Sequence, residues 1–536
     1  MTDVLFSGGT ILTMDSYQPR AEAMLIRENR IVAVGPRRKA MAEATHSEPV
    51  EIDLKGRTVI PGFNDSHIHV TQLGDRGNSL DLSGMNKAQI LESVVEKSQG
   101  LKPGAILTGY QWDYPACPDP HLRDLDELVP DRAVLLFQFS GHGAWANSKA
   151  LALLGISRDT PDWEIGGPDR DEDGELNGIV RELGGAPGIR RLFIKQLGNR
   201  KEAGANLQTA MERLREHGIT SVQDNTWFPW VVGEIGKLNR RGEQSCRISC
   251  WSPGFLGLLD LWFSLKRFNR YWYSRGPRKF FLDGAFSSHT AWLDEPYADK
   301  RETSGAGRPV EKIIPWIRRA TRQGRQIACH SIGDAATGAY LDAMATMNGP
   351  RTMELRHRIE HGQLIRERDI ERIVKFGMVV SAQPQAAGTP EKDRALLGPE
   401  RAVGAYPYRS LIDAGVHLAF GSDYPGELTF EPLLGVHLAV NREGGQAITP
   451  EEAIACYTAG SAWAEFKENE KGKLKSGYLC DIAVLSADPT KVDSSTIKDI
   501  TVDATIVNGK LVYLRSGTEL RPGMQVGTDL SLARAE

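Results

Sequence analysis

The sequence predicts an α/β fold: a (β/α)8 TIM-like barrel, a small β-sandwich built from both chain ends, and a large insertion after the first barrel strand. Three observations support this prediction. Helical segments that end at a glycine alternate with short apolar strands through the middle of the chain. Both ends of the chain consist of short apolar runs separated by turn residues. One connection in the middle region is far too long for a single crossover between strands.

The repeating unit of the middle region is a helix, a glycine, an apolar strand and a polar tip. For example, ANLQTAMERLREHG, with Leu207, Met211 and Leu214 on one face, precedes ITSVQD, and EKIIPWIRRATRQG precedes RQIACHSIGD. Together with RTVIPGFNDSHIH and RKFFLDGAF, these segments supply enough strands to close an eight-stranded barrel. A doubly wound open sheet remains the alternative, although the chain has no GxGxxG cofactor turn.

The two ends of the chain predict a second, smaller unit. Residues 1–57 contain the apolar runs VLFSGGTILTMD and AEAMLIRENRIVAVG, and residues 468–536 contain SGYLCDIAVL and ATIVNGKLVY with an Asn508-Gly509 turn. We expect these ends to pair into one composite β-sandwich, which leaves residues 58–467 for the barrel. The Pro- and Asp-rich segment 71–200 is expected to be an insertion that covers the active-site end of the barrel.

Size and composition exclude several classes of protein. A chain of 536 residues is too long for one ordinary core, and 40% hydrophobic with 25% charged residues is typical of a soluble globular protein. The formal charge of -4 provides no basic surface for nucleic acid or anionic membrane. No apolar run approaches the ~18 residues that span a bilayer, no secretory signal is visible at the start, and the six cysteines form no CxxC pair. We therefore predict a cytoplasmic protein without a nucleic-acid or membrane partner.

Histidine, lysine and aspartate residues recur where the predicted strands end, which is where a barrel carries its functional groups. Side chains alternate along a strand, so the two histidines of SHIH share one face, and His361 shares a face with Ile359. Imidazoles and a carboxylate that converge in one cavity suit Zn²⁺ or a similar divalent ion. The alternative for each histidine is an ordinary residue satisfied by local hydrogen bonds. In chain order the candidate metal ligands are His67, His69, Lys279, His330, His361 and Asp423.

Several segments, taken in order, resemble a known family. PGFNDSHIH resembles the first-strand motif of the amidohydrolase superfamily of metal-dependent hydrolases. GHGAWANSKAL, KFFLDGAFSSHTA, CHSIGDAA, RIEHGQ and FGSDYP together resemble the amidohydrolase-3 branch, which includes N-substituted formamide deformylase-like enzymes. The similarity extends from the first sandwich strands to the C-terminal GYLCDIAVL.

The resemblance implies a role for each candidate ligand. The histidines of the opening motif would bind the more buried metal, and His330 and His361 would bind a second metal or complete a site for one. Asp423 would contact a metal and act as general base or acid. Lys279 stands where binuclear relatives carry a bridging carboxylated lysine; a salt-bridged structural lysine is the alternative. The implied cofactor is one or two divalent ions, with Zn²⁺ as the first choice.

The reaction implied by the resemblance is hydrolysis of an amide-like C–N bond in a small molecule. Metal-bound hydroxide would attack the carbonyl, and Asp423 would take the proton and return it to the leaving amine. A deaminase or a cyclic-amide hydrolase would use the same metal site, so both remain alternatives. A non-catalytic scaffold of the superfamily is a further alternative. The resemblance also suggests a homodimer.

Other residues are candidates for the substrate pocket. We expect His142, in SGHGAWANSKAL, to polarise the carbonyl or contact the substrate, with a helix-capping loop histidine as the alternative. Trp112 is expected to line or roof the pocket, unless it is a packing anchor of the insertion, and His289 to lie at the pocket mouth. Asp65 is expected to orient a ligand histidine. For Glu182, in GIVRE, a surface salt bridge is the default expectation.

Overall fold

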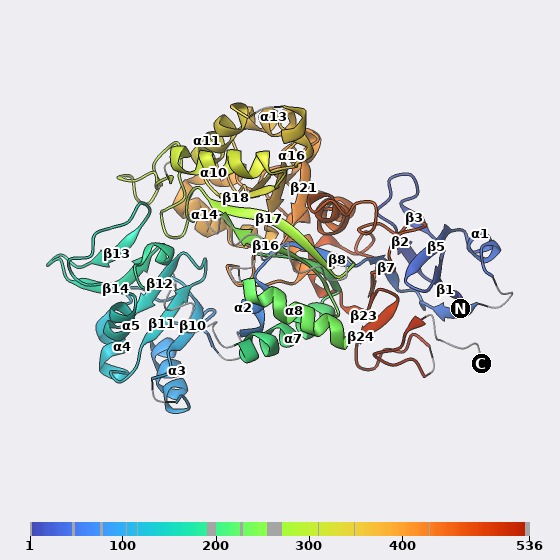
Figure 1. Ribbon diagram of the computed structural model, residues 1–536, viewed down its shortest axis with the longest axis horizontal. Coiled ribbons are helices and arrows are strands. Elements are labelled where there is room, and N and C mark those ends of the chain that lie inside the picture. Colours follow the sequence, from blue (N-terminus) through green and yellow to red (C-terminus); the bar gives the residue numbers. More distant parts are fainter. Residues whose placement is uncertain are drawn as a thin grey trace.

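The architecture is that of a computed structural model. It describes residues 3–45, 49–75, 79–102, 104–114, 116–189, 200–225, 229–254, 271–308, 310–347, 349–427, 429–521 and 523–530. Figure 1 shows the sheets of the two chain ends on the right, the barrel in the centre and the insertion at the lower left.

The centre of the molecule is a barrel of eight parallel strands in the order β21-β20-β19-β18-β17-β16-β15-β8. At the seam between β21 and β8, the Asp423 amide donates a hydrogen bond of 2.6 Å to the His67 carbonyl, so the sheet is nearly closed. The predicted barrel is confirmed, and the open-sheet alternative is wrong. The strands are β8 (Phe63–Ile68), β15 (Ile219–Asp224), β16 (Arg247–Pro253), β17 (Tyr273–Phe281), β18 (Ile327–Ser331), β19 (Arg358–His361), β20 (Val379–Ala382) and β21 (His417–Phe420).

Helices cover the outside of the barrel and bury their apolar faces against it. In α7, the predicted face of Leu207, Met211 and Leu214 is buried in the main core. The helices that follow the barrel strands are α2 (Val70–Asp75), α7 (Arg200–Glu216), α8 (Pro229–Arg241), α10 (Val310–Arg322), α11 (Asp334–Ala345), α12 (Pro350–Glu354), α13 (Glu367–Lys375), α14 (Pro390–Leu397), α15 (Pro399–Gly404), α16 (Tyr408–Asp413), α17 (Pro432–Val440), α18 (Pro450–Ala455) and α19 (Ser461–Ala464).

The two chain ends form two further sheets that share a core, as the predicted fold class requires. One sheet has the order β5-β4-β1-β6 and the other β24-β23-β22-β7-β2-β3, so strands from both ends lie in the second. Phe6 and Ile26 from the first end pack in one cluster with Ile482 and Ile506 from the second. The strands are β1 (Asp3–Ser7), β2 (Thr10–Leu12), β3 (Arg20–Ala21), β4 (Ala23–Arg27), β5 (Arg30–Gly35), β6 (Val50–Asp53), β7 (Thr58–Pro61), β22 (Ile482–Leu485), β23 (Val502–Val507) and β24 (Lys510–Leu514).

Strand β7 differs from the predicted boundary at residue 58. It pairs with β2 on one side and β22 on the other, so it lies in the terminal sheet and not in the barrel. Gly62 then separates β7 from β8, and a Cβ at Gly62 would lie 2.1 Å from the Thr220 side chain. The division of the chain into domains remains a prediction.

The segment between α2 and α7 forms a sheet of its own, in the order β13-β14-β12-β11-β10-β9. Its strands are β9 (Leu80–Asp81), β10 (Leu107–Trp112), β11 (Val134–Gln138), β12 (Gly143–Ala146), β13 (Gly167–Arg170) and β14 (Leu176–Arg181), and its helices are α3 (Lys87–Gln99), α4 (Leu122–Leu128) and α5 (Ser148–Leu153). Two hydrophobic clusters consist of residues of this segment alone. Its loop between β11 and β12 contributes Phe139, Ser140 and His142 to a cavity at the end of the barrel.

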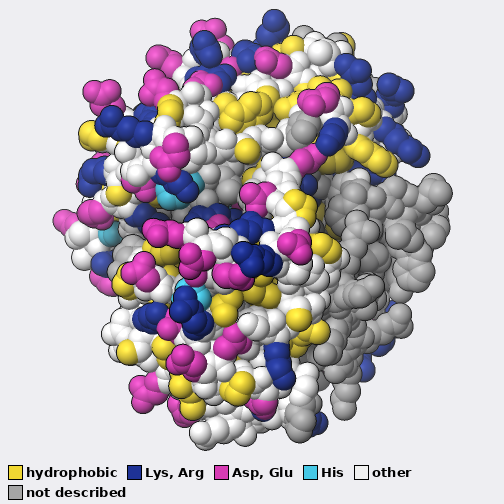
Figure 2. Space-filling model, turned by 90° about the vertical axis from the view of Figure 1, so that its left-hand side faces the viewer, with side chains coloured by type: hydrophobic (Ala, Val, Ile, Leu, Met, Phe, Trp, Pro, Cys, Tyr) yellow, Lys and Arg dark blue, Asp and Glu magenta, His cyan; other side chains and the backbone are white. Residues whose placement is uncertain are grey.

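The surface carries no signs of a membrane-spanning segment in the part that is described. None of the described helices combines the length and the apolar character needed to cross a bilayer. Acidic and basic side chains are interspersed over the face shown in Figure 2, which is the left-hand side of Figure 1. All six cysteines are buried, and no disulfide bond joins any two of them.

Candidate metal centre

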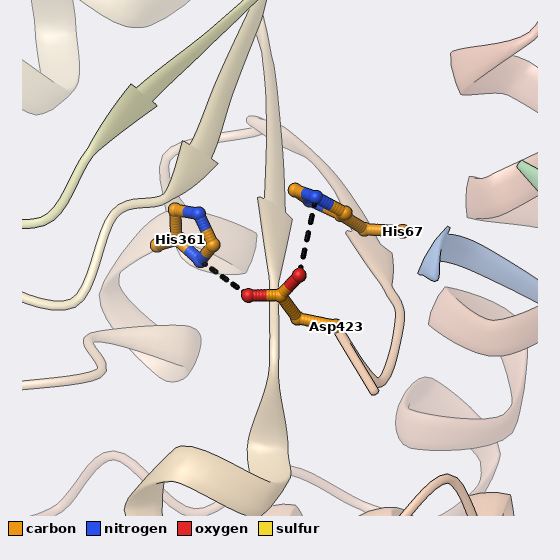
Figure 3. Close-up of side chains that lie close together, drawn as sticks. All are labelled: His67, His361 and Asp423. Carbon is orange, nitrogen blue, oxygen red and sulfur yellow. Dashed lines mark ion pairs between the residues drawn. The ribbon is translucent and has the colours of Figure 1, made fainter. Parts of the chain in front are cut away.

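Three side chains from distant parts of the sequence meet at the end of the barrel. The Asp423 carboxylate lies between the imidazoles of His67 and His361 (Figure 3): Oδ1 is 3.3 Å from His67 Nε2, and Oδ2 is 3.9 Å from His361 Nδ1. One ligand atom from each of the three residues lies within 4.8 Å of the others. They come from β8, from β19 and from the loop after β21, where the parallel strands end.

His69 joins this group from the same side as His67. Its Nε2 lies 3.2 Å from Asp423 Oδ1, which agrees with the predicted shared face of the two histidines. Asp65 fixes the backbone beneath them, because its Oδ1 accepts hydrogen bonds of 3.0 Å from the amides of both His67 and Ser422. Asp65 therefore acts on the backbone of a candidate ligand and ties β8 to the loop that carries Asp423.

Each of two imidazoles is held at Nδ1 by a side-chain oxygen, so Nε2 is the ring nitrogen that remains for a metal; His67 Nε2 lies 3.3 Å from Asp423 Oδ1 and 3.5 Å from Lys279 Nζ. His67 Nδ1 is 2.7 Å from Glu360 Oε2, and His361 Nδ1 is 2.7 Å from Gln383 Oε1. His361 Nε2 is buried and has no hydrogen-bond partner among the described residues. Buried polar atoms are normally satisfied, and metal-binding histidines normally donate their second N–H to a carboxylate or amide oxygen. The donor set therefore fits a divalent ion.

Sequence reasoning missed Glu360 and Gln383, and it assigned the faces of β19 incorrectly. Alternation predicts that His361 shares a face with Ile359, but Ile359 packs in the main hydrophobic core while Glu360 reaches His67. The reason is local: His361 has a φ of 75°, which breaks the alternation and lets consecutive side chains reach the centre. The signal was present in RIEH, because charged residues at alternate positions of a buried strand must face a polar interior.

Electrostatics keeps these groups in the protonation states that bind a metal. Burial would raise the pKa of Asp423, but His67, His69 and His361 outweigh it and hold this pKa well below its usual value. Burial lowers the pKa of His361 to about 3, so the ring is neutral at pH 7. Burial would likewise raise the pKa of Glu360, but Arg358 and His67 lower it to about 2.

Lys279 lies at the centre, as predicted from its strand. Its Nζ is 3.5 Å from His67 Nε2, and the residue is buried. No carboxylate of the described residues forms an ion pair with it, so the structural alternative of a salt-bridged lysine finds no partner there. Burial lowers the pKa of Lys279 to about 8, because the charged ammonium is poorly solvated.

His330 lies beside the centre but is not one of the three grouped ligands. Its ring centroid is 4.3 Å from that of His361, while its Nε2 is 3.0 Å from the Gly284 carbonyl oxygen and 3.6 Å from Asp283 Oδ1. Burial lowers the pKa of His330 well below its usual value, so the ring is neutral. Its role as a metal ligand remains a prediction.

The insertion brings His142 to the same end of the barrel. Its ring centroid is 5.1 Å from that of His330, and its Nδ1 is 3.0 Å from both carboxylate oxygens of Glu182. Burial would lower the pKa of His142, but Glu182 outweighs it and the pKa is raised. Glu182 also accepts a hydrogen bond of 2.6 Å from Thr290 Oγ1. The expected surface salt bridge of Glu182 is therefore wrong, because this carboxylate points inward and holds a histidine.

Two predicted pocket residues lie elsewhere. Trp112 is fully buried in the core of the insertion, where its Nε1 donates a hydrogen bond of 2.8 Å to the Leu136 carbonyl. His289 lies 3.0 Å from Asp299 and packs edge-on against Tyr297. The structure does not bring either residue to the cavity beside the centre.

That cavity connects the centre with the insertion. It measures about 520 Å³, including the part open to solvent. Segments of the insertion, of the loop after β17, of α14 and of the loop after β21 line it. Its polar and charged lining residues include His142, His330, His361, Gln363, Lys392, Asp393, Tyr406, Asp423 and Glu427.

Comparisons with known proteins show the family of the chain. The chain is 30% identical to the protein YtcJ of Bacillus subtilis, over 96% of this chain and 99% of that protein. It is 26% identical to the N-substituted formamide deformylase of Arthrobacter pascens, over 97% and 99% of the two chains. The crystal structure of an uncharacterised metal-dependent hydrolase from Pyrococcus furiosus is similar, with a TM-score of 0.73, 30% identity and coverage of 91% and 100%. The model of the amidohydrolase family matches residues 50–513. The chain belongs to the amidohydrolase family of metal-dependent hydrolases.

Proposed function

We propose that this protein hydrolyses an amide-like C–N bond of a small molecule at a divalent-metal centre held by His67, His69, His361 and Asp423. One observation carries the proposal: two imidazoles, fixed at Nδ1 by Glu360 and Gln383, surround a carboxylate at the end of the barrel. Zn²⁺ is the first choice because neutral imidazoles and a carboxylate are its usual ligands.

The residues around the centre divide the chemical work. A divalent ion bound there supplies Lewis acidity, which lowers the pKa of water from about 15.7 to about 7 and polarises a carbonyl. Asp423, ionised at neutral pH, accepts the proton of the attacking water and donates it to the leaving nitrogen. His142, whose pKa Glu182 raises, donates a hydrogen bond from its protonated ring to the carbonyl oxygen as negative charge develops on it.

Lys279 is the residue that would extend the centre to two ions. Carboxylation requires a neutral amine, and a pKa of about 8 leaves a useful neutral fraction near neutral pH. A carboxylated Lys279 would add a carboxylate to the centre, and His330 is the neighbouring imidazole left to hold the second ion. Mass spectrometry of the intact protein in bicarbonate distinguishes a carboxylated Lys279 from an unmodified one, and a Lys279→Ala variant serves as the comparison.

The relatives favour amide hydrolysis among the reactions open to such a centre. The Arthrobacter pascens relative is named as a deformylase of N-substituted formamides, and it matches nearly the whole chain. Deamination and the opening of a cyclic amide need the same centre and the same proton transfers. Substrates for these two reactions are therefore tested as separate classes in the experiment.

The test is a substrate screen on purified protein that has been stripped of metal and reloaded with Zn²⁺ or Mn²⁺. N-formyl, N-acyl and cyclic amides are compared with aminated ring compounds, and released amine, acid or ammonia is measured. We expect turnover of acyclic amides that requires added metal and is lost, with the metal, in His67→Ala and Asp423→Asn. Turnover by a metal-free His67→Ala protein, or hydrolysis of none of the amides by the reloaded enzyme, contradicts the proposal.

A further inference from the structure

Two carboxyl groups in the cavity take no part in the metal centre. Asp393 lies on α14, and Glu427 follows Asp423 by four residues in the loop after β21. Both line the same cavity as His361 and Asp423. Their side chains therefore face the space that a substrate would fill beyond the reacting bond.

Each of the two carboxyl groups has one oxygen that is left without a partner in the part of the chain that is described. Asp393 Oδ2 and Glu427 Oε2 are buried and have no hydrogen-bond partner among the described residues. Asp393 Oδ1 is only 3.5 Å from the Tyr406 hydroxyl, which lies closer to the Ala386 carbonyl, at 3.1 Å. The two residues are 4% and 7% exposed, and the described residues place no cation within 4.0 Å of either.

The nearby cations already have partners. Lys392 Nζ lies 2.5 Å from Asp113 Oδ2, and it also lies 4.2 Å above the Phe139 ring. Arg442 Nη2 donates hydrogen bonds of 2.9 and 3.1 Å to the carbonyls of Ala402 and Ala405, while its Nε has no hydrogen-bond partner among the described residues. These cations therefore leave both carboxyl groups without a direct ion pair.

Buried acids without partners are rare, because desolvation disfavours the charge unless a cation or donors compensate for it. Burial raises the pKa of Asp393 to about 7 and that of Glu427 well above its usual value, and it outweighs the opposing effects of Arg442 and Lys392. Two such groups in a substrate cavity form a site for a ligand that brings positive charge and several N–H donors.

We propose that the substrate carries, besides the amide that reacts, a positively charged nitrogen group that binds the Asp393 and Glu427 carboxylates. An ammonium, amidinium or guanidinium group meets this requirement. The inference rests on the proposed function only for the nature of the reacting bond. Phe139, Phe286 and Leu396 also line the cavity, and they suit the apolar spacer between the amide and the charged end.

The experiment compares matched probes on the metal-loaded protein. N-acetyl diaminoalkanes, which end in an ammonium group, are compared with N-acetyl aminoalcohols of the same length, over spacers of graded length. Turnover gives kcat/KM for each pair. Calorimetry with the corresponding methanesulfonamides, which have no hydrolysable carbonyl, gives the dissociation constants without turnover.

We expect the ammonium probe of the best length to bind at least about tenfold more tightly than its hydroxyl match, as a buried charged pair predicts. Glu427→Gln and Asp393→Asn should each reduce this preference, and the double variant should abolish it. Glu391→Gln, on the same helix with an 85% exposed side chain, is the matched control and should keep it.

The outcomes separate this inference from the proposed function. Equal binding of the ammonium and hydroxyl probes by the wild-type protein overturns the inference, and so does a preference that survives in a folded double variant. If no amide is hydrolysed but the sulfonamides show a preference that depends on the two acids, the proposed function fails and the cation site stands. If neutral amides are hydrolysed without any preference, the proposed function stands and the cation site fails.

Discussion

Glu182 and His142 show how the insertion sets the protonation of a group at the barrel end. Glu182 is held in the left-handed region, with a φ of 53°, and its amide donates a hydrogen bond of 2.6 Å to the His142 carbonyl. The same residue therefore fixes both the backbone and the ring of His142. A strained residue persists only where its surroundings determine it, which places Glu182 among the residues that position the candidate catalytic groups.

Replacing this carboxylate should move the pH profile of the enzyme. Glu182 raises the pKa of His142, so Glu182→Gln lowers it. If protonated His142 stabilises the reacting oxygen, the enzyme loses activity as pH rises through the pKa of His142. The Glu182→Gln variant should therefore lose activity at a lower pH than the wild type. The measurement is kcat/KM against pH, with Glu175→Gln, an exposed partner of Arg158, as control. An unchanged basic limb in Glu182→Gln would refute this role of the pair.

The candidate ligands could be predicted from the sequence because each stands at the end of a recognisable strand. His67, His69 and Asp423 follow apolar runs, and the structure brings all three together. Glu360 and Gln383 could not be predicted with the same rule, because their positions depend on the φ of His361 and on which strands are neighbours. Asp393 lies on the short helix α14, and Glu427 lies in the loop after β21, where no period predicts the direction of a side chain.

Strand β19 buries a charged pair in the interior of the barrel. Arg358 and Glu360 are both fully buried and lie 2.7 Å apart, from Nε to Oε1. Arg358 also donates to the Ser66 carbonyl at 2.8 Å and to Ser381 Oγ at 2.9 Å, so it connects β19 with β8 and β20. The strand thus carries a structural pair and a candidate ligand within four residues.

Removing one charge of this pair should destabilise the protein strongly. Glu360→Gln leaves the Arg358 guanidinium buried without its counter-charge, which costs about 3–5 kcal/mol in the free energy of unfolding. Urea unfolding of metal-free protein measures this change. Asp342→Asn removes the exposed partner of Arg372 and should cost less than about 1 kcal/mol.

The destabilisation should depend on pH with a defined sign. The folded-state pKa of Glu360 is about 2, below its ordinary value of 4.5, so its stabilising contribution is present above pH 4.5 and is lost as pH falls toward 2. The difference between wild type and Glu360→Gln should therefore shrink in acid. A constant difference down to pH 3 would show that the Glu360 charge is not its source.

At the scale of the molecule, repeats in the sequence predicted the barrel, and turn-rich ends predicted the terminal sheets. Strand β7 was assigned to the wrong sheet because the run TVIP is apolar on both faces, and such a run fits a barrel or a sandwich equally well. One partner of β7 is β22, which lies more than 400 residues later in the chain. No local pattern in the sequence can predict this pairing.

Metal removal should lower the thermal stability of the whole protein. The candidate ligands lie on β8, on β19 and in the loop after β21, so a bound ion ties together strands on both sides of the barrel seam. Binding to the folded state alone stabilises it by about 2.7 kcal/mol when the free metal is 100-fold above its dissociation constant. Calorimetric scans against buffered Zn²⁺ should show a Tm that rises with free metal in the wild type. The Tm of Asp423→Asn should stay flat, and an equal rise in this variant would place the ion elsewhere.

The pairing of β7 with β22 also orders the events of synthesis. A chain emerging from the ribosome presents β7 early, but the neighbour on its second edge, Ile482–Leu485, is translated only after the entire barrel. Until then that edge is open to other nascent chains. Since β7 leads through Gly62 directly into the strand of His67, the sheet that precedes this strand is completed only after the whole barrel has been translated.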